Sequence, residues 1–298
     1  MNADAWYAET RTHRVGDLRT VVRRDGAGPA LVCLHGFPTS GWDFEPLWPA
    51  LTARFDCLAP DLIGLGRASK PRDLISVAMQ ADMVEAVCAA EGVSAAALLA
   101  HDLGDTVAQE LLARTREGSA KITWTRCALL NGGLFPETHR PRLIQRLLAS
   151  RAGPLVARLS TERTFRKNMT RVFGPETPPS EAFLRQSWRL LAADDGRSAL
   201  PALIRYMDER RTHRTRWVTP LIERVIPIRI IDGVLDPVSG GHMVDRFEAL
   251  VPEADVVRLP DLGHYPHVED PEAVLSALLP FLLDQAGVRA VGGGSDTN

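Results

Sequence analysis

The sequence has few cysteines and no closely spaced cysteine pair, which argues against two classes of protein. Its 298 residues contain four cysteines, and none of them forms a Cys-x-x-Cys pair. Neither a disulfide scaffold nor a cysteine-based metal site is therefore expected. We interpret all four as small buried hydrophobic residues of a protein in a reduced compartment, namely Cys33, Cys57, Cys88 and Cys127.

Long hydrophobic runs and an excess of either charge are also lacking. No apolar stretch at the amino terminus has the length of a signal peptide, and none elsewhere could span a membrane. The chain has 35 basic and 37 acidic residues and a net charge of -2, and we interpret its arginines as spread along the chain rather than clustered. We therefore expect a soluble cytoplasmic protein that binds neither nucleic acid nor a membrane surface.

Cofactor and metal motifs are not evident. The run at residues 61–66 (DLIGLG) contains Gly-x-Gly but not the Gly-x-Gly-x-x-Gly of dinucleotide-binding proteins. Several histidines are scattered without the spacing of metal ligands. We therefore expect no cofactor and no metal site, and we assign no ligand role to His13, His139, His213, His242 or His267.

Short apolar runs alternate with segments of helical periodicity. This alternation is typical of an α/β protein whose mostly parallel sheet is covered by helices on both faces. Continuous apolar runs, as at residues 29–35 (PALVCLH), indicate strands that are buried on both sides. The expected strands are at 18–24, 29–35, 55–61, 95–100, 126–131, 228–232 and 256–259, and the expected helices at 76–91, 104–117, 239–250 and 271–284.

Residues 134–219 interrupt this alternation. The segment is rich in arginine, mostly helical in pattern and broken by prolines, and it contains no clear strand. We interpret it as a helical cap inserted over the carboxyl ends of the strands. Residues 1–133 and 220–286 then form one core domain, and residues 287–298, which are rich in glycine, form a flexible tail.

The most informative residue is Asp102, in the run at residues 97–105 (ALLAHDLGD). An apolar run ends there in small-x-Asp-x-Gly, which is typical of the strand-to-helix turn called a nucleophile elbow. A carboxylate that attacks an sp3 carbon forms a usable alkyl ester, whereas attack on an ester or amide gives an anhydride that reverts. A carboxylate at this turn therefore indicates one of three reactions: opening of an epoxide, displacement of a halide, or opening of a lactone at its alkyl carbon. The alternative is that Asp102 only caps the helix that follows.

Other segments supply the rest of a hydrolytic site, in the chain order of α/β-hydrolases. The turn at residues 35–38 (HGFP) follows a strand, and the N–H groups of Phe37 and Leu103 are expected to form an oxyanion hole, unless the turn is an ordinary Gly-Pro turn. Asp236 and His264 each follow a later strand. A carboxylate on Nδ1 orients an imidazole and stabilises its charged form, so we predict that these two complete a triad with the nucleophile.

Two neighbours of the nucleophile receive a structural interpretation. Asp105 lies early in the following helix, where a carboxylate interacts favourably with the helix dipole. His101 precedes the nucleophile and is expected to support the site without taking part in the reaction.

Several runs of the sequence resemble one hydrolase group. The runs HGFPTSGWDF, DLIGLGRASKP, HDLGD and GHYPHVEDP resemble the α/β-hydrolases that include epoxide hydrolases and haloalkane dehalogenases, over nearly the whole chain. Within that group the chain most resembles the mesoderm-specific transcript family and its bacterial relatives. The segments that carry this resemblance are HDLGDTVAQELL, NGGLFPETHRP, FGPETPPS and RTHRTRWV. The resemblance implies the α/β-hydrolase fold, the triad and hydrolase activity on an undefined substrate.

The chain departs from this group at positions that select the substrate. Haloalkane dehalogenases carry a tryptophan directly after the nucleophile, and one branch has an asparagine after the His-Gly, whereas this chain has Leu103 and Phe37. Epoxide hydrolases use two cap tyrosines to protonate the ring oxygen, and the predicted cap contains only Tyr206. This tyrosine either serves as the acid or packs between cap and core. Two tryptophans of the predicted cap, Trp188 and Trp217, carry indole N–H groups that are candidates to donate a hydrogen bond to a leaving halide.

We therefore predict a hydrolase that acts through an Asp nucleophile and an alkyl-enzyme ester, most similar to epoxide hydrolases. Its partners are a small apolar electrophile and water. A haloalkane dehalogenase-like or lactone hydrolase reaction is the first alternative, and a ligand receptor or pseudoenzyme on the same fold is the second. The sequence leaves the size of the substrate and the oligomeric state open.

Overall fold

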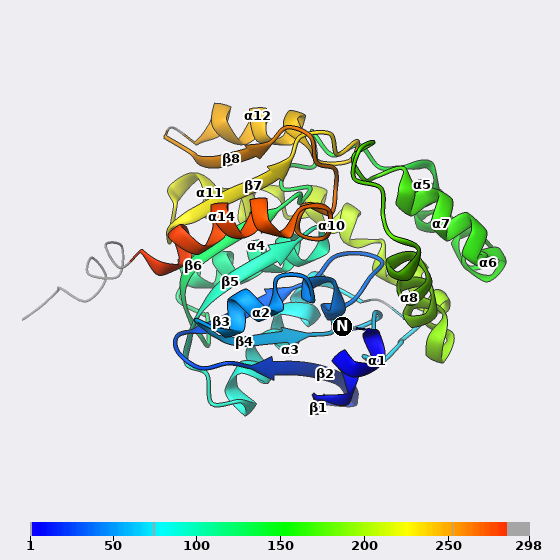
Figure 1. Ribbon diagram of the computed structural model, residues 1–298, viewed down its shortest axis with the longest axis horizontal. Helices are drawn as coiled ribbons and strands as arrows, with labels where there is room; N and C mark the ends of the chain where they lie inside the picture. Colours follow the sequence, from blue (N-terminus) through cyan, green and yellow to red (C-terminus); the bar gives the residue numbers. More distant parts are fainter. Residues whose placement is uncertain (1, 74, 252, 285–298) are drawn as a thin grey trace, which may run out of the picture.

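The structure is a computed structural model that describes residues 2–73, 75–251 and 253–284. The predicted tail at residues 287–298 lies outside the described residues. Figure 1 shows a central twisted sheet with helices on both faces and a further group of helices beside one end of the sheet. None of the described helices has the length and apolar character that crossing a membrane requires.

Eight strands form the sheet, in the order β1-β2-β4-β3-β5-β6-β7-β8. The first two strands are antiparallel to their neighbours, and the other six run parallel to one another. The predicted α/β-hydrolase fold with a mostly parallel sheet is therefore confirmed. The strands are β1 (Thr10–Val15), β2 (Leu18–Asp25), β3 (Ala30–Leu34), β4 (Asp56–Pro60), β5 (Ala95–His101), β6 (Thr123–Leu130), β7 (Ile228–Gly233) and β8 (Asp255–Leu259).

Helices cover both faces of this sheet. Helix α4 packs against β3, β5 and β6 and against the helices α3 and α11, while α14 packs on β7 from the opposite face (Figure 1). The core helices are α1 (Ala3–Ala8), η1 (Gly41–Phe44), α2 (Trp48–Thr52), α3 (Val77–Ala90), α4 (Leu103–Glu117), α11 (Arg214–Glu223), α12 (Gly241–Leu250), α13 (Pro266–Glu269) and α14 (Pro271–Leu283).

The sequence pattern explains both the strands that it predicts and the one that it misses. In β5 every side chain after Ala95 is buried, because helices cover the sheet on both sides, and a continuous apolar run results. Strand β1 (Thr10–Val15) lies at the edge of the sheet, pairs only with β2 and is mostly exposed, so its sequence is polar and carries little strand signal.

Between β6 and α11 the chain forms helices and no strand, and every residue of this segment is described. The predicted boundary at residue 219 falls inside α11, and this helix packs against α4 of the core. The remaining helices, which Figure 1 shows beside the sheet, are called the inserted helices below. They are α5 (Leu143–Ala149), α6 (Gly153–Leu159), α7 (Glu162–Thr170), α8 (Glu181–Ala192), η2 (Ala193–Ala199), α9 (Leu200–Leu203) and α10 (Tyr206–Thr212).

Candidate active site

Asp102 lies in the turn between β5 and α4, where its backbone φ is 49°. A residue other than glycine adopts a positive φ at a cost, so the surrounding structure must hold this turn in place. Helix α4 approaches the sheet so closely that a Cβ atom on Gly104 would lie 2.1 Å from the backbone oxygen of Leu34. The Asp102 side chain makes no capping hydrogen bond to α4, so the helix-cap alternative does not describe it.

The oxyanion turn after β3 lies directly against this carboxylate. The backbone N–H of Phe37 donates a hydrogen bond of 3.0 Å to Oδ2 of Asp102. A Cβ atom on Gly36 would lie 2.9 Å from Cβ of Asp102, so glycine permits the close approach. Leu103 is the first residue of α4, and its N–H therefore has no acceptor within the helix. The backbone N–H of Phe37 thus holds Oδ2, and no backbone donor to Oδ1 is found among the described residues.

Asp236 follows β7 and is surrounded by hydrogen-bond donors. Its Oδ1 accepts a bond of 2.7 Å from the N–H of Val238, and its Oδ2 accepts from the N–H and hydroxyl of Ser239 at 3.1 and 2.9 Å. The amide of Asn131 donates to Oδ2 at 3.2 Å. Burial opposes the charge, but His264 and these donors outweigh it and lower the pKa of Asp236. The sequence analysis did not identify Asn131 or Ser239.

His264 is held by this carboxylate. Its Nδ1–H donates to Oδ2 of Asp236 at 2.7 Å, and its backbone N–H donates to the oxygen of Val172 at 2.8 Å. Burial disfavours the charged imidazole, but the negative charges of Asp236 and Asp102 outweigh burial and raise the pKa of His264 to about 9. The resting imidazole is therefore protonated at neutral pH.

Arg210 and Tyr206 of α10 lie near Asp102. Arg210 is 2% exposed, and its Nη2 lies 3.2 Å from the backbone oxygen of Asp102, to which it donates, and 3.9 Å from Oδ1. Its Nε donates to the hydroxyl of Thr106 at 2.7 Å, and its guanidinium carbon lies 4.6 Å from the ring centre of Tyr206. Among the described residues, neither Nη1 of Arg210 nor the hydroxyl of Tyr206 has a hydrogen-bond partner.

Tyr206 and Arg210 differ in charge, and only Tyr206 was identified from the sequence. Burial and the negative charge of Asp102 raise the pKa of Tyr206, which keeps its phenol neutral and able to donate. The sequence analysis identified Tyr206 but missed Arg210, which is one of five arginines at residues 205–216. The available signal was the spacing of four residues, which places both side chains on one face of a helix.

The two tryptophans that the sequence analysis named have different surroundings. The indole N–H of Trp217 donates to Oε2 of Glu110 at 2.7 Å, so this residue is already paired and does not serve as a halide donor. Trp188 is half-buried, packs against Phe165 at a ring distance of 5.7 Å and lines a pocket that also contains His264.

Asp105 is a buried acid in the first turn of α4. It is fully buried, and neither carboxyl oxygen has a hydrogen-bonding side chain among the described residues. Burial and the neighbouring charge of Asp102 raise the pKa of Asp105 well above its ordinary value. The charged form is therefore disfavoured, which weakens the interaction with the dipole of α4 that the sequence analysis expected.

A largely apolar pocket of about 110 Å³ lies beside His264. Phe37, His264 and Tyr265 line its inner end, and side chains from α5, α7 and α8 line the remainder. The pocket therefore suits an apolar substrate. Its polar lining residues are Arg142, Gln145, Ser160, Thr164 and Asn168.

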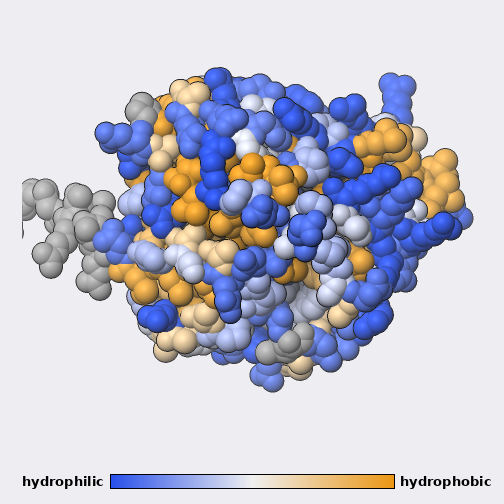
Figure 2. Space-filling model, turned by 45° about the horizontal axis from the view of Figure 1, so that its top comes forward, coloured by the Kyte–Doolittle hydropathy of each residue, from blue (hydrophilic) through white to orange (hydrophobic). Residues whose placement is uncertain are grey.

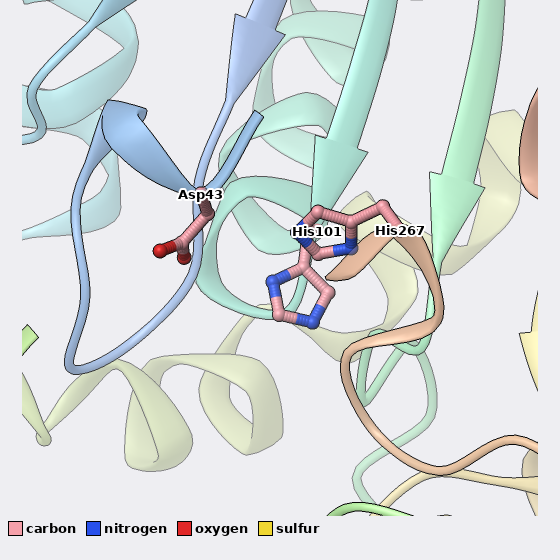
Figure 3. Close-up of side chains that lie close together, drawn as sticks. All are labelled: Asp43, His101 and His267. Carbon is pink, nitrogen blue, oxygen red and sulfur yellow. The ribbon is translucent and has the colours of Figure 1, made fainter. Parts of the chain in front are cut away.

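A second buried cluster lies behind His264. Figure 3 shows the rings of His101 and His267 against one another with Asp43 beside them, and one ligand atom of each lies within 4.8 Å of the others. Two imidazoles and a carboxylate are ligand types that Zn²⁺ accepts. However, burial lowers the pKa of both histidines, that of His267 to about 3, and raises the pKa of Asp43, so burial disfavours the charged carboxylate that a metal ion would need.

The contacts of this cluster point to a supporting role. The Nε2–H of His101 donates to the backbone oxygen of His264 at 2.8 Å, and the hydroxyl of Thr39 donates to Asp43. The hydrogen bond from His101 thereby holds the loop that carries His264. The expectation that the protein has no metal site stays a prediction.

Comparison with known proteins agrees with this geometry. The family described as "Alpha/beta hydrolase family" matches residues 31–277. The mesoderm-specific transcript homolog protein of Bos taurus is 40% identical over 266 residues, which cover 86% of this chain and 79% of that protein. The resemblance inferred from the sequence is therefore confirmed.

Solved structures of similar fold include members of both predicted classes. The epoxide hydrolase CorEH has a TM-score of 0.74 and 19% identity, with 91% of this chain and 97% of that chain covered. The haloalkane dehalogenase DbeA-M1 loop variant of Bradyrhizobium elkanii has a TM-score of 0.77 and 19% identity, with 92% and 95% covered. At this identity the likeness concerns the fold alone. With the family match over residues 31–277, the chain belongs to the alpha/beta hydrolase family.

Proposed function

We propose that this protein is an epoxide hydrolase-like enzyme in which Asp102 attacks a substrate carbon and forms an alkyl-enzyme ester. The observation that carries the proposal is that the two carboxylate oxygens of Asp102 have different neighbours. Oδ2 is held by the N–H of Phe37, whereas Oδ1 faces the guanidinium of Arg210 at 3.9 Å. A carboxylate in this position is prepared to attack through one oxygen while backbone donors hold the other.

In the first step Oδ1 forms a bond to a ring carbon of the epoxide, and the carbon–oxygen bond of the ring breaks. The electron pair goes to the ring oxygen, which takes the phenolic proton of Tyr206. Arg210 stabilises the negative charge that develops, because its Nη1 is buried and has no other partner among the described residues. The cap therefore contributes an acid and a cation in place of the usual tyrosine pair.

In the second step His264 first gives up its own proton, which restores the phenol of Tyr206 through the solvent. The neutral imidazole then removes a proton from water, and the resulting hydroxide attacks the ester carbonyl. The first step prepares this change of role. Once Asp102 is an ester it has lost the negative charge that helps to raise the pKa of His264, so the imidazole becomes easier to deprotonate. The oxyanion forms on Oδ2, where the N–H groups of Phe37 and Leu103 support it. Collapse of this intermediate releases the diol and regenerates Asp102.

The inserted helices act as the cap in this proposal. They supply Tyr206 and Arg210 from α10 and most of the apolar pocket from α5, α7 and α8. A low-dielectric pocket strengthens the interactions of Arg210 with developing charge and favours an apolar substrate. Water is the second substrate.

Displacement of a halide is the second candidate, and one observation favours it. The buried guanidinium of Arg210 would stabilise a leaving halide as well as an alkoxide, because both carry a negative charge. Trp188, which lines the pocket, would add an indole N–H. Only the epoxide reaction requires the proton of Tyr206, so the effect of Tyr206→Phe separates the two candidates.

Trapping the ester tests the proposal. The His264→Gln variant is incubated with styrene oxide or with 1-bromobutane, and the intact mass and peptide masses are measured. The expected result is an adduct on Asp102 with the epoxide, because an amide cannot activate the water of the second step. Asp102→Asn, which keeps the shape of the side chain, is the matched control and should give no adduct.

Labelled water tests the origin of the product oxygen. In a single turnover of the wild-type enzyme in H₂¹⁸O, the oxygen added to the product should be unlabelled, because it comes from Asp102. Label in the first-turnover product, or an adduct on another residue, would contradict the mechanism.

A further inference from the structure

Helices α5 and α6 expose four leucines on the outer side of the inserted helices. Leu143 and Leu147 are four residues apart on α5, and Leu155 and Leu159 are four apart on α6, so each pair shares one helix face. Their exposed fractions are 72%, 40%, 58% and 67%. Figure 2 shows an apolar patch at this edge of the molecule, bordered by hydrophilic side chains. We call these four residues the leucine face.

The same part of the chain is strongly basic. Residues 138–171 contain nine arginines and lysines but a single acidic residue, Glu162, although the whole chain has a net charge of -2. The sequence analysis treated arginine as spread along the chain, which is wrong for this segment. Among the described residues, Arg166 is the one member of the nine with an acidic partner. The exposed members are Arg140, Arg146, Arg151, Arg158, Arg163, Lys167 and Arg171.

The leucine face adjoins the entrance of the apolar pocket. Ile144 and Leu148 alternate with the exposed leucines of α5 and point to the other side, where they line the pocket that contains His264. A second hollow on the outside is lined by several of the arginines, and it shares Arg142 and Ile144 with the pocket. The exposed leucines, the basic hollow and the pocket therefore form one continuous region.

We propose that the leucine face docks the protein on the surface of an anionic lipid bilayer. The leucines enter the boundary between headgroups and acyl chains, and the surrounding cations lie over the anionic headgroups. Short amphipathic helices with leucine on one face and Arg and Lys around it are typical of proteins that lie in this interface. Each cation near an anionic leaflet adds to the attraction, which falls off within a Debye length.

A second copy of the chain fits this face less well. A symmetric dimer would bring the same basic segment of both copies together, and like charges oppose such an interface. An anionic surface instead complements every cation that borders the leucines. Docking there would present the pocket to molecules dissolved in the bilayer, and an apolar substrate would enter without crossing water.

Vesicle binding tests the proposal on the full chain. The Asp102→Asn variant is used throughout, so the result does not depend on the proposed chemistry. We expect binding to vesicles of phosphatidylcholine with about 30 mol % phosphatidylglycerol to exceed binding to phosphatidylcholine alone by at least about tenfold, and to weaken in about 0.5 M NaCl. A dye on Leu155→Cys should report an apolar environment on binding; the four native cysteines are buried and will not compete for it.

Matched variants locate the surface. Leu143→Ser with Leu159→Ser should reduce binding by about tenfold or more, as should Arg146→Gln with Arg158→Gln. Ile222→Ser removes an exposed apolar residue from α11, and Arg14→Gln with Arg54→Gln removes two exposed cations elsewhere, so both controls should bind like the parent. Thermal unfolding checks that each variant is folded.

Three outcomes would overturn the proposal. The first is no binding to anionic vesicles, and the second is equal loss of binding in the controls. The third is a dimer that forms without vesicles and is abolished by the leucine substitutions, which would assign the face to a second copy of the chain.

Discussion

Replacing Asp236 with asparagine should bring the pKa of His264 from about 9 to below its ordinary value of 6.5. Burial alone lowers the pKa of this imidazole, and the carboxylate 2.7 Å from Nδ1 is the largest influence that raises it. A change from 9 to 6.5 corresponds to about 3 kcal/mol of lost stabilisation of the charged form. Asp102→Asn should lower the pKa less, because Asp102 acts through its charge and makes no hydrogen bond to the imidazole among the described contacts.

A titration of the imidazole by NMR measures this change directly. The wild-type protein and both variants are compared, and His264→Gln identifies the signal. Turnover of Asp236→Asn should also fall by about 10⁴, if the behaviour of a Ser-His-Asp triad applies here. A pKa that stays near 9 in Asp236→Asn, or that falls equally in both variants, would refute the reasoning.

The interaction of His264 with Asp236 makes the free energy of unfolding depend on pH. The pKa of His264 is higher in the folded chain, about 9, than the ordinary 6.5 of an unfolded chain. The stabilisation of the folded chain by the charged imidazole is therefore complete below pH 6.5 and is lost as the pH rises through 9. The stability difference between the wild type and His264→Gln should shrink by about 3 kcal/mol over that range, as measured by urea unfolding, and should not shrink in the Asp236→Asn background.

Three further substitutions test other parts of the site. Tyr206→Phe should slow formation of the ester by about 100-fold and leave its hydrolysis unchanged, as single-turnover kinetics with an epoxide would show. Gly104→Ala should destabilise the fold by about 3 kcal/mol or more in urea unfolding, because the new Cβ would meet the backbone oxygen of Leu34 at 2.1 Å. The stability of Asp105→Asn relative to the wild type should increase as the pH rises above the ordinary range of aspartate, because burial raises the pKa of Asp105 in the folded chain; urea unfolding that shows no change of this difference with pH would contradict it.

The sequence alone could predict the fold and the order of the candidate catalytic residues, because these depend on local pattern. Strand β5 is buried on both faces and reads as one apolar run, and the small residues at the turn allow α4 to approach β3. Asp236 and His264 each follow a strand of the parallel set, and the carboxyl ends of such strands meet at one edge of the sheet.

The parts that could not be predicted depend on how distant segments pack. Arg210 meets Asp102 across more than a hundred residues of sequence, and its helical spacing from Tyr206 does not reveal which way that face points. Glu110 pairs with Trp217 because α11 packs on α4, a contact between helices far apart in the chain. The burial that raises the pKa of Asp105 likewise appears only once the fold has formed.

Charge balance connects these residues to the proposed chemistry. In the resting site two carboxylates, Asp102 and Asp236, face two cations, His264 and Arg210. Attack by Asp102 moves one negative charge from its carboxylate to the departing oxygen without changing the total. Arg210 therefore keeps a negative partner throughout the step, which lets a buried guanidinium remain in place at little cost. The neutral analogue Arg210→Met should consequently slow ester formation more than it weakens substrate binding, and the opposite result would assign Arg210 to structure alone.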